Sequence, residues 1–315
     1  MSASKKILTV FGATGNQGGS VLDVVLSRPD LTSKYALRGI TRDVESAKSR
    51  ALTTKGVEMV QADLDDETSL KAAMNGAYGA FGVTDFWSTM SKDTEIKQGK
   101  NIFHAAQASG VKHLVFSALP YAEKITDGKL KHVEHFDSKA IVKEYIEANK
   151  GEMLVSYFMP AMFLQEAKKQ IQSGEDGNPA LSLPFPDENI AWPMIDPRID
   201  TGKYVLGLFE AGEKANGVFV HGVSVWTTPK DFLTAIGTSA GREVKFNVLP
   251  AEVYASFLPD VIKSEISEMM ALIGYYSYFG KDQETQQSTH DKWLLEGTEK
   301  LTLEKWAENN KPWEF

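Results

Sequence analysis

Short apolar runs alternate with longer amphipathic stretches over the first half of the chain. Residues 7–11 form a continuous apolar run with one threonine, as expected for a parallel strand buried on both faces. Further strand candidates lie at 35–40, 57–61, 79–83, 113–117 and 153–158. The stretches with helical periodicity between them lie at 19–26, 44–53, 69–75, 94–108 and 137–148. This alternation predicts an α/β fold, a Rossmann-type doubly wound parallel sheet with helices on both faces.

The rhythm changes after Pro160. Five prolines between residues 179 and 197 mark a loop-rich region. Helices are predicted at 201–210, 229–239 and 260–273, with Thr228 as the N-cap of the second. Residues 217–220 and 243–248 look like isolated strands. We therefore predict a Rossmann domain over residues 1–160 and a smaller, mostly helical C-terminal lobe over 161–315, with some segments of the lobe returning to the sheet.

A glycine-rich loop follows the first predicted strand and opens the first predicted helix. It has the spacing G-x-x-G-x-x-G and consists of Gly12, Ala13, Thr14, Gly15, Asn16, Gln17 and Gly18. Glycine at these positions permits a tight turn, close approach of a pyrophosphate and close packing of helix against strand. The free N–H groups at the helix N-terminus favour an anion there. In this context the loop predicts dinucleotide binding rather than a merely structural turn.

The end of the second predicted strand distinguishes NAD from NADP. NAD-binding proteins usually carry an acidic residue there, which holds the ribose 2′-hydroxyl. This chain has Thr41 and Arg42 instead, and a guanidinium suits a 2′-phosphate because its donors are paired and its charge is permanent. The alternative is that Arg42 pairs with Asp43 or Glu45 at the surface. We therefore predict NADP(H) as the cofactor.

Further cofactor contacts are expected at the carboxyl ends of the other strands, where ligands bind in open parallel sheets. Asp63 and Leu64 follow the third strand and would lie near the adenine, although a solvated loop aspartate would look the same. The remaining residues expected at the cofactor are Thr84, Ser117, Lys139, Pro160 and Phe163.

Composition excludes several classes of function. The net charge is −8, so the chain has no general attraction to nucleic acid. It contains no cysteine, which excludes disulfides and thiolate chemistry and fits a reducing intracellular compartment. The longest apolar stretch, 153–164, is too short to span a membrane. His132 and His135 lack a third metal ligand. We expect a cytoplasmic protein, with the nucleus as an additional location, that is a monomer or homodimer without a metal.

Seven segments spread over nearly the whole chain resemble the NmrA-like family, atypical members of the short-chain dehydrogenase/reductase superfamily. They are GATGNQGG, ITRD, QADLDD, NGAYGAFGVTDFW, IKQGKN, HFDSKAIVKEYI and LTLEKWAENNK. GNQG and HFDSK are unusual among catalytic members of the superfamily. The resemblance implies a Rossmann fold with a small C-terminal lobe, NADP(H) binding and, in several members, regulation through protein partners.

Ordinary members of that superfamily use the pair Tyr-x-x-x-Lys, and only half of it is retained here. The matching segment begins at His135 and ends at Lys139. Lys139 can hold the nicotinamide ribose and is the main acid–base group in related atypical reductases. His135 either carries a proton near neutral pH or is structural. Ser117 matches the superfamily's catalytic serine, and Tyr121 offers a phenol from another direction. These four residues are the candidate catalytic groups.

Aromatic and methionine residues near the strand ends predict a pocket for an apolar ligand or a partner peptide, with core packing as the alternative. The residues expected to line the pocket are Phe86, Trp87, Met159 and Met162, together with Asp85. Tyr275, Tyr276 and Tyr278 are expected to cover it. Two functions follow. The missing tyrosine slightly favours a redox-sensing regulator that binds NADP(H) and a regulatory protein partner. The pocket favours an NADP(H)-dependent enzyme of secondary metabolism that reduces, isomerises or cyclises a small molecule.

Overall fold

A seven-stranded sheet lies at the centre of the computed structural model, which describes residues 4–174 and 177–315. Every neighbouring pair in this sheet is parallel. The strand order is β11 (Phe219–Gly222), β6 (Leu154–Pro160), β5 (His113–Ser117), β4 (Gly79–Gly82), β1 (Lys6–Val10), β2 (Tyr35–Thr41) and β3 (Glu58–Gln61). The order reverses between β1 and β4, the place where ligands bind in such sheets. The prediction of a doubly wound parallel sheet is confirmed.

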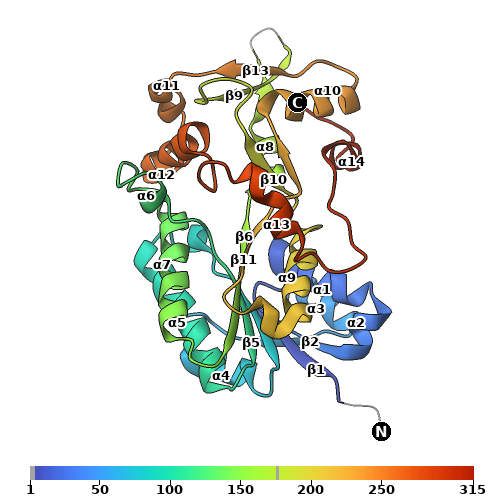
Figure 1. The fold of residues 1–315 in the computed structure, drawn as a ribbon. Coiled ribbons are helices and arrows are strands. Elements are labelled where there is room, and N and C mark those ends of the chain that lie inside the picture. The colour runs from blue at the N-terminus through green and yellow to red at the C-terminus, as the bar shows by residue number, and fades with distance from the viewer. Residues whose placement is uncertain (1–3, 175–176) are drawn as a thin grey trace.

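Helices cover both faces of this sheet (Figure 1). One side carries α4 (Glu67–Met74), α5 (Lys92–Ala108) and α7 (Glu134–Asn149). The other carries α1 (Asn16–Leu26), α2 (Pro29–Lys34), α3 (Ala47–Thr54) and α9 (Thr201–Ala211). The helices pack closely where they meet. A Cβ at Gly99 of α5 would lie 2.7 Å from a methyl carbon of Val142 of α7, so glycine is needed for this contact.

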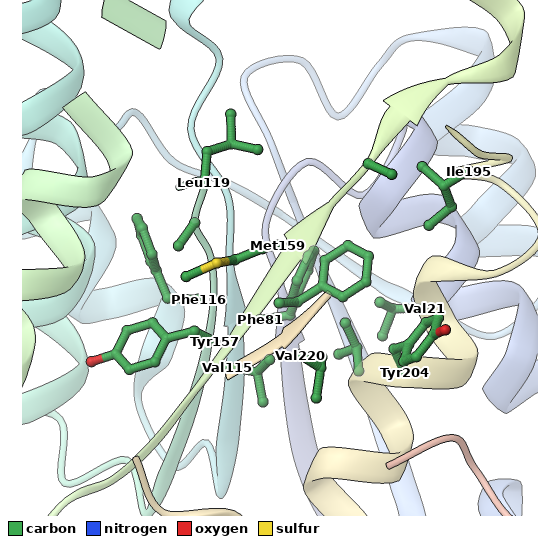
Figure 2. Close-up of a cluster of buried hydrophobic side chains, with 14 of the residues drawn as sticks. Val21, Phe81, Val115, Phe116, Leu119, Tyr157, Met159, Ile195, Tyr204 and Val220 are labelled. Atoms are coloured by element: carbon green, nitrogen blue, oxygen red, sulfur yellow. The ribbon is translucent and has the colours of Figure 1, made fainter. Parts of the chain in front are cut away.

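The core lies on both faces of the sheet (Figure 2). Phe116 of β5 and Tyr157 of β6 point to one side, and Val21 of α1 and Tyr204 of α9 lie on the other. All four side chains are fully buried. Burial of a large apolar side chain contributes about 1.5–3 kcal/mol, so a sheet covered in this way holds its strand ends in fixed positions.

The C-terminal lobe contains two small sheets that the sequence analysis did not predict. One has the order β12 (Val225–Thr227), β10 (Trp192–Ile195) and β7 (Met162–Phe163), and the other has the order β13 (Lys245–Val248), β9 (Pro179–Leu183) and β8 (Ile171–Ser173). The lobe's helices are α8 (Leu164–Lys169), α10 (Pro229–Ala240), α11 (Ala251–Ser256), α12 (Asp260–Ala271), α13 (Gln287–Asp291) and α14 (Leu303–Asn309). A short helix, α6 (Ala122–Ile125), precedes α7. None of the described helices has the length and apolar character needed to cross a membrane.

The two strands predicted as isolated are both paired. β11 extends the central sheet, with Val220 opposite Phe158 of β6. β13 lies parallel to β9. Both predictions of isolation are wrong because the partners lie more than 50 residues away along the chain, beyond any local pattern. The predicted helix start at Thr228 is confirmed, since its hydroxyl accepts the N–H of Asp231 at 3.0 Å.

Two buried histidines make the stability of the fold depend on pH. Burial lowers the pKa of His113 to about 4 and the pKa of His221 to about 3. The Nδ1 atom of each ring has no hydrogen-bond partner among the described residues. Below the ordinary histidine pKa of 6.5, the unfolded chain binds protons that the folded chain does not. Their contribution to stability is therefore present above about pH 6.5 and is lost as the pH falls towards 3.

We expect the substitution His221→Phe to reduce this pH dependence. Phenylalanine can keep the stacking on Phe279, whose ring centre lies 4.0 Å from that of His221, but it cannot bind a proton. Between pH 7 and pH 5 the free energy of unfolding should fall by about 2 kcal/mol more in the wild type than in the variant. Urea denaturation at the two pH values measures the free energy of unfolding. Equal decreases of this free energy in the wild type and the variant would contradict the prediction.

Candidate functional site

The glycine loop between β1 and α1 needs glycine for two different reasons. Gly12 has a φ of +60°, in the left-handed region that other residues rarely adopt. A Cβ at Gly18 would lie 2.4 Å from the carbonyl oxygens of Phe11 and Gly12, so any side chain would push α1 away from β1. α1 then begins after Gly15 without a side-chain cap, and Gly15 and Asn16 are exposed. The first N–H groups of α1 are therefore open to an anion.

β2 lies beside β1 and brings Thr41 and Arg42 next to this loop. The Thr41 hydroxyl accepts the N–H of Asp43 at 3.2 Å. Arg42 is exposed, and no carboxylate in the described part of the chain pairs with it. Glu45 pairs instead with Arg50 at 3.4 Å, and an Asp43 oxygen accepts the N–H of Glu45 at 2.8 Å. The guanidinium of Arg42 is thus available to an external anion.

Asp63 and Leu64 follow β3, the outermost strand on this side of the sheet. The Asp63 carboxylate accepts the N–H of Asp65 at 2.9 Å, and the carbonyl of Leu64 accepts a hydrogen bond from the Asn101 amide at 2.8 Å. Asp63 is exposed and Leu64 is half-buried. These bonds fix the loop, and neither residue borders the large cavity described below.

Lys139 of α7 forms an ion pair with Glu95 of α5, a buried residue that the sequence analysis missed. Glu95 is 1% exposed, and its carboxylate accepts hydrogen bonds from the Lys139 ammonium, from the Thr84 hydroxyl at 2.7 Å and from the Ser138 hydroxyl. Three donors thus compensate for the removal of a charge from water, and breaking such a buried pair costs about 3–5 kcal/mol. The network fixes Lys139 at the carboxyl end of β4, beside Thr84.

The sequence did contain one signal for Glu95. On α5 it shares the buried face with Gln98 and Ile102, three and seven residues further along. A charged residue at a core-facing position of an amphipathic helix needs a partner, and that requirement could have identified it. The partner itself, Lys139, could not be identified because it lies 44 residues away.

Ser117 ends β5 and Tyr121 follows it four residues later, but only Ser117 borders the cavity. Its hydroxyl donates to the Gln17 side-chain oxygen at 2.8 Å, which joins the end of β5 to the first turn of α1. Tyr121 lies at the start of α6 with the Lys124 ammonium 4.6 Å from its ring centre. Burial raises the pKa of its phenol. Tyr121, the candidate phenol, is thus not among the residues that border the cavity.

A cavity of about 1090 Å³ lies over the carboxyl ends of β1, β4, β5 and β6. This is at the upper end of the volumes usual for small-molecule sites. Its wall at the strand ends includes Asn16, Gln17, Thr84, Ser117, Lys139, Pro160 and Phe163. The opposite wall consists of apolar side chains of α12, namely Ile262, Ile266, Met269 and Met270. Polar groups from the small sheet of β8, β9 and β13 lie in the wall as well, among them Gln172, Ser182 and Asn247.

The predicted pocket residues divide into two groups. Asp85, Phe86, Trp87, Met162 and Tyr278 border the cavity. Met159, Tyr275 and Tyr276 do not. Met159 packs in the core near Phe116 (Figure 2).

The end of α12 explains why only one of the three tyrosines reaches the cavity. A π-helical turn at Leu272–Tyr276 and Ser277, with a φ of +65°, redirect the chain. Tyr275 is left 62% exposed, while the buried Tyr278 hydroxyl donates to the carbonyl of Pro160 at 3.1 Å. This corrects the expectation that all three tyrosines cover the pocket.

His135 is the second residue of α7 and also borders the cavity. Its Nδ1 is hydrogen-bonded to Glu265 of α12, and both residues are 8% exposed. Its ring lies against Trp87, with 5.1 Å between the ring centres. The structure therefore brings three of the four candidate catalytic residues, Lys139, His135 and Ser117, to one cavity.

The comparisons with known proteins identify the family of the chain. The model of the NmrA-like family matches residues 4–308. An NmrA-like family domain-containing oxidoreductase of Aspergillus flavus, lnaB, is 29% identical, with 96% of each chain covered. The corresponding oxidoreductase FrzB of a Cladobotryum species is 31% identical, with 78% of this chain and 77% of the relative covered.

Two solved structures share the fold at low sequence identity. The negative transcriptional regulator NmrA in complex with NADP has a TM-score of 0.82 at 20% identity, covering 98% of this chain and 96% of that one. The triphenylmethane reductase of Citrobacter sp., complexed with NADP(H), has a TM-score of 0.72 at 17% identity, covering 95% and 98%. Since the family model spans nearly the whole sequence, this chain belongs to the NmrA-like family.

Proposed function

We propose that this chain is an NADPH-dependent oxidoreductase that reduces an apolar small molecule in the cavity beside the glycine loop. The cavity carries the proposal, because about 1090 Å³ over the strand ends leaves room for a substrate. Two further observations support it. Fungal relatives of the chain are named oxidoreductases, and a structural neighbour is a reductase complexed with NADP(H).

The strand ends supply the groups that would hold NADP(H). The loop from Gly12 through Thr14 to Gly18, with the uncapped start of α1, would take the pyrophosphate. Thr41 and Arg42 would take the 2′-phosphate, and Asp63 and Leu64 would lie towards the adenine. The groups near the nicotinamide riboside would be Thr84, Ser117, Lys139, Pro160 and Phe163. When bound, the reduced cofactor supplies a hydride.

A redox-sensing regulator is the second candidate, favoured by the histidine at the position of the usual tyrosine. The two functions make different demands on the cavity. A sensor that responds only to the cofactor requires no space for a second small molecule, whereas a reductase does. Turnover of a small molecule therefore distinguishes them.

The glycine loop can be tested with two substitutions in adjacent turns of the chain. Gly15→Val should abolish NADPH binding, because a Cβ there would already lie 3.2 Å from the carbonyl oxygen of Gly12 and the side chain would cover the first N–H groups of α1. Gly19→Ala is the matched control, since its Cβ would lie an ordinary 3.5 Å from the carbonyl oxygen of Ala13. Calorimetric titration measures both. Normal NADPH binding by the Gly15 variant would show that the loop assignment is wrong.

Arg42 tests the preference for NADP(H) over NAD(H). Arg42→Ala should weaken NADPH binding by about 1.5–3 kcal/mol, the usual contribution of a charged hydrogen bond, and leave NADH binding nearly unchanged. Arg50→Ala removes an exposed arginine that is already paired with Glu45 and should change neither affinity. Equal losses for both cofactors in the Arg42 variant would argue against a 2′-phosphate contact.

Lys139 tests whether the chain is an enzyme. Lys139→Met should lower turnover at saturating NADPH by about 100-fold or more, because the ammonium would fix the nicotinamide ribose and so position the hydride donor. The double variant Glu95→Gln/Lys139→Met removes both buried charges together, so neither is left buried without its partner. It shows whether the loss of turnover persists in a folded protein. Lys143→Met, one helical turn further along α7, is the charge-matched control.

Turnover should be followed at the nicotinamide absorbance with ketones, imines and quinones. Reduction that disappears in both Lys139 variants supports the enzyme. Absence of reduction with every substrate, combined with a protein partner whose affinity depends on the redox state of the bound cofactor, would favour the regulator instead.

A further inference from the structure

His135 joins the cavity to a buried carboxylate on the other lobe. Its imidazole borders the cavity beside the rings of Phe86 and Trp87, whose centres lie 6.0 Å and 5.1 Å away. On the other edge of the ring, Nδ1 is hydrogen-bonded to Oε1 of Glu265. No described residue forms a hydrogen bond with Nε2. The ring thus has one nitrogen committed to the protein and one available to a molecule in the cavity.

The Glu265 carboxylate is fixed independently of the histidine ring. Its Oε2 accepts the N–H of Glu134 at 2.9 Å, and its Oε1 also accepts the N–H of His135 at 3.2 Å. α7 has no N-cap side chain of its own, since Val133 occupies that position. Glu265 therefore caps α7 from another element. An ionised carboxylate only accepts hydrogen bonds, so Nδ1 carries the proton in this contact and Nε2 is left as the exchangeable position.

The helix that carries Glu265 also closes the cavity. α12 contributes Ile262, Ile266 and Met269 to the cavity wall. Three residues after Glu265, Glu268 makes a second contact with the start of α7: its carboxylate bonds Nδ1 of His132 at 2.6 Å and accepts the N–H of His132 at 2.7 Å. His132 does not border the cavity. The His135–Glu265 pair therefore exists only when α12 lies against α7, which is also the position that covers the cavity.

We propose that His135 and Glu265 form a proton-transfer dyad that is complete only when α12 covers the substrate. This inference rests on the proposed reductase function. His135, with a proton on each nitrogen, donates the Nε2 proton to the nitrogen or oxygen of a bound C=N or C=O group whose carbon accepts the hydride. The substrate gains one hydride and one proton, and the imidazole becomes neutral with Nδ1–H still on Glu265. A proton from water restores it after product release. Glu265 is the positioning residue and is not itself protonated.

Lys139 is less suited to this proton transfer. Its ammonium is already an ion-pair partner of the buried Glu95, which also binds two hydroxyl groups. Release of its proton would leave that carboxylate buried without a counter-charge. We therefore assign different roles to the two residues: Lys139 binds and orients the nicotinamide ribose, and His135 transfers the proton.

The test uses two related substrates, of which only one needs a proton. A dihydroisoquinoline imine requires a hydride and a proton, whereas its N-methyl iminium analogue requires the hydride alone. At a pH where the free imine is unprotonated, His135→Gln should slow imine reduction by about 100-fold. Glu265→Gln should slow it by about 10-fold or more, because an amide keeps the α7 cap but does not fix the ring's tautomer. Both variants should slow the iminium far less than the imine, because reduction of the iminium needs no proton.

Glu268→Gln is the matched control, because it makes the same change on the same helix at a contact with a histidine outside the cavity. It should leave both rates unchanged. Equal slowing of the imine and the iminium in the Glu265 variant, or equal effects of the Glu265 and Glu268 variants, would overturn the dyad while the reductase function stands. A wild-type protein that reduces neither substrate, nor any ketone or quinone, would overturn the reductase function and the dyad with it.

A measurement without turnover addresses the pair directly. The chain has six histidines, so nitrogen-15 spectra of the imidazoles can be assigned with His135→Gln. In the neutral wild-type ring, the His135 proton should be found on Nδ1. Glu265→Gln should shift the tautomer population of His135 towards Nε2–H, and Glu268→Gln should not. A wild-type His135 with its proton on Nε2 would contradict the proposal whatever the activities.

Discussion

The parallel sheet of seven strands, covered by helices on both faces, is the constraint on which the rest of this molecule depends. Because every strand runs in the same direction, all their carboxyl ends meet at one edge. The glycine loop after β1, Thr84 after β4, Ser117 at the end of β5 and Pro160 at the end of β6 come together for this reason alone.

Two buried carboxylates then give that edge its chemical character. Glu95 holds Lys139 from within the Rossmann half, and Glu265 holds His135 from the C-terminal lobe. Each carboxylate has at least three donors, which offsets the cost of burying its charge. The consequence is that two cationic or titratable groups on one face of α7, a helical turn apart, have different surroundings. The Lys139 ammonium is paired with a carboxylate that also binds two hydroxyl groups, whereas the His135 ring borders the cavity and its Nε2 has no hydrogen-bond partner among the described residues.

Cofactor binding and chemistry are separable in this arrangement. The features that would hold NADP(H) are the loop, the uncapped α1 and Arg42, and none of them depends on the residue at position 135. A histidine at position 135 therefore leaves the features that would hold NADP(H) unchanged and alters only a group that borders the cavity. The function must therefore be argued from the cavity between β4, β6 and α12 and not from the fold alone.

Local patterns determined much of the fold from the sequence. The strands up to β6, the helices between them other than α2 and α6, the glycine loop and the Thr228 cap depend on residues within a few positions of one another, so periodicity and backbone sterics were sufficient to predict them. The absence of an acid after β2 was likewise readable at one point in the chain. Lys139 and His135 were identified as candidate catalytic residues from the sequence motif alone.

The partners of those two residues were decided only by the tertiary structure. Glu95 lies 44 residues from Lys139, and Glu265 lies 130 residues from His135. The same holds for β11, which joins β6 across more than 50 residues, and for Tyr121, which the turn into α6 carries away from the cavity. A single sequence specifies which side chains face a core, because that depends on the spacing of apolar residues within one helix or strand. It does not specify which distant element each one meets, because that depends on how whole elements pack.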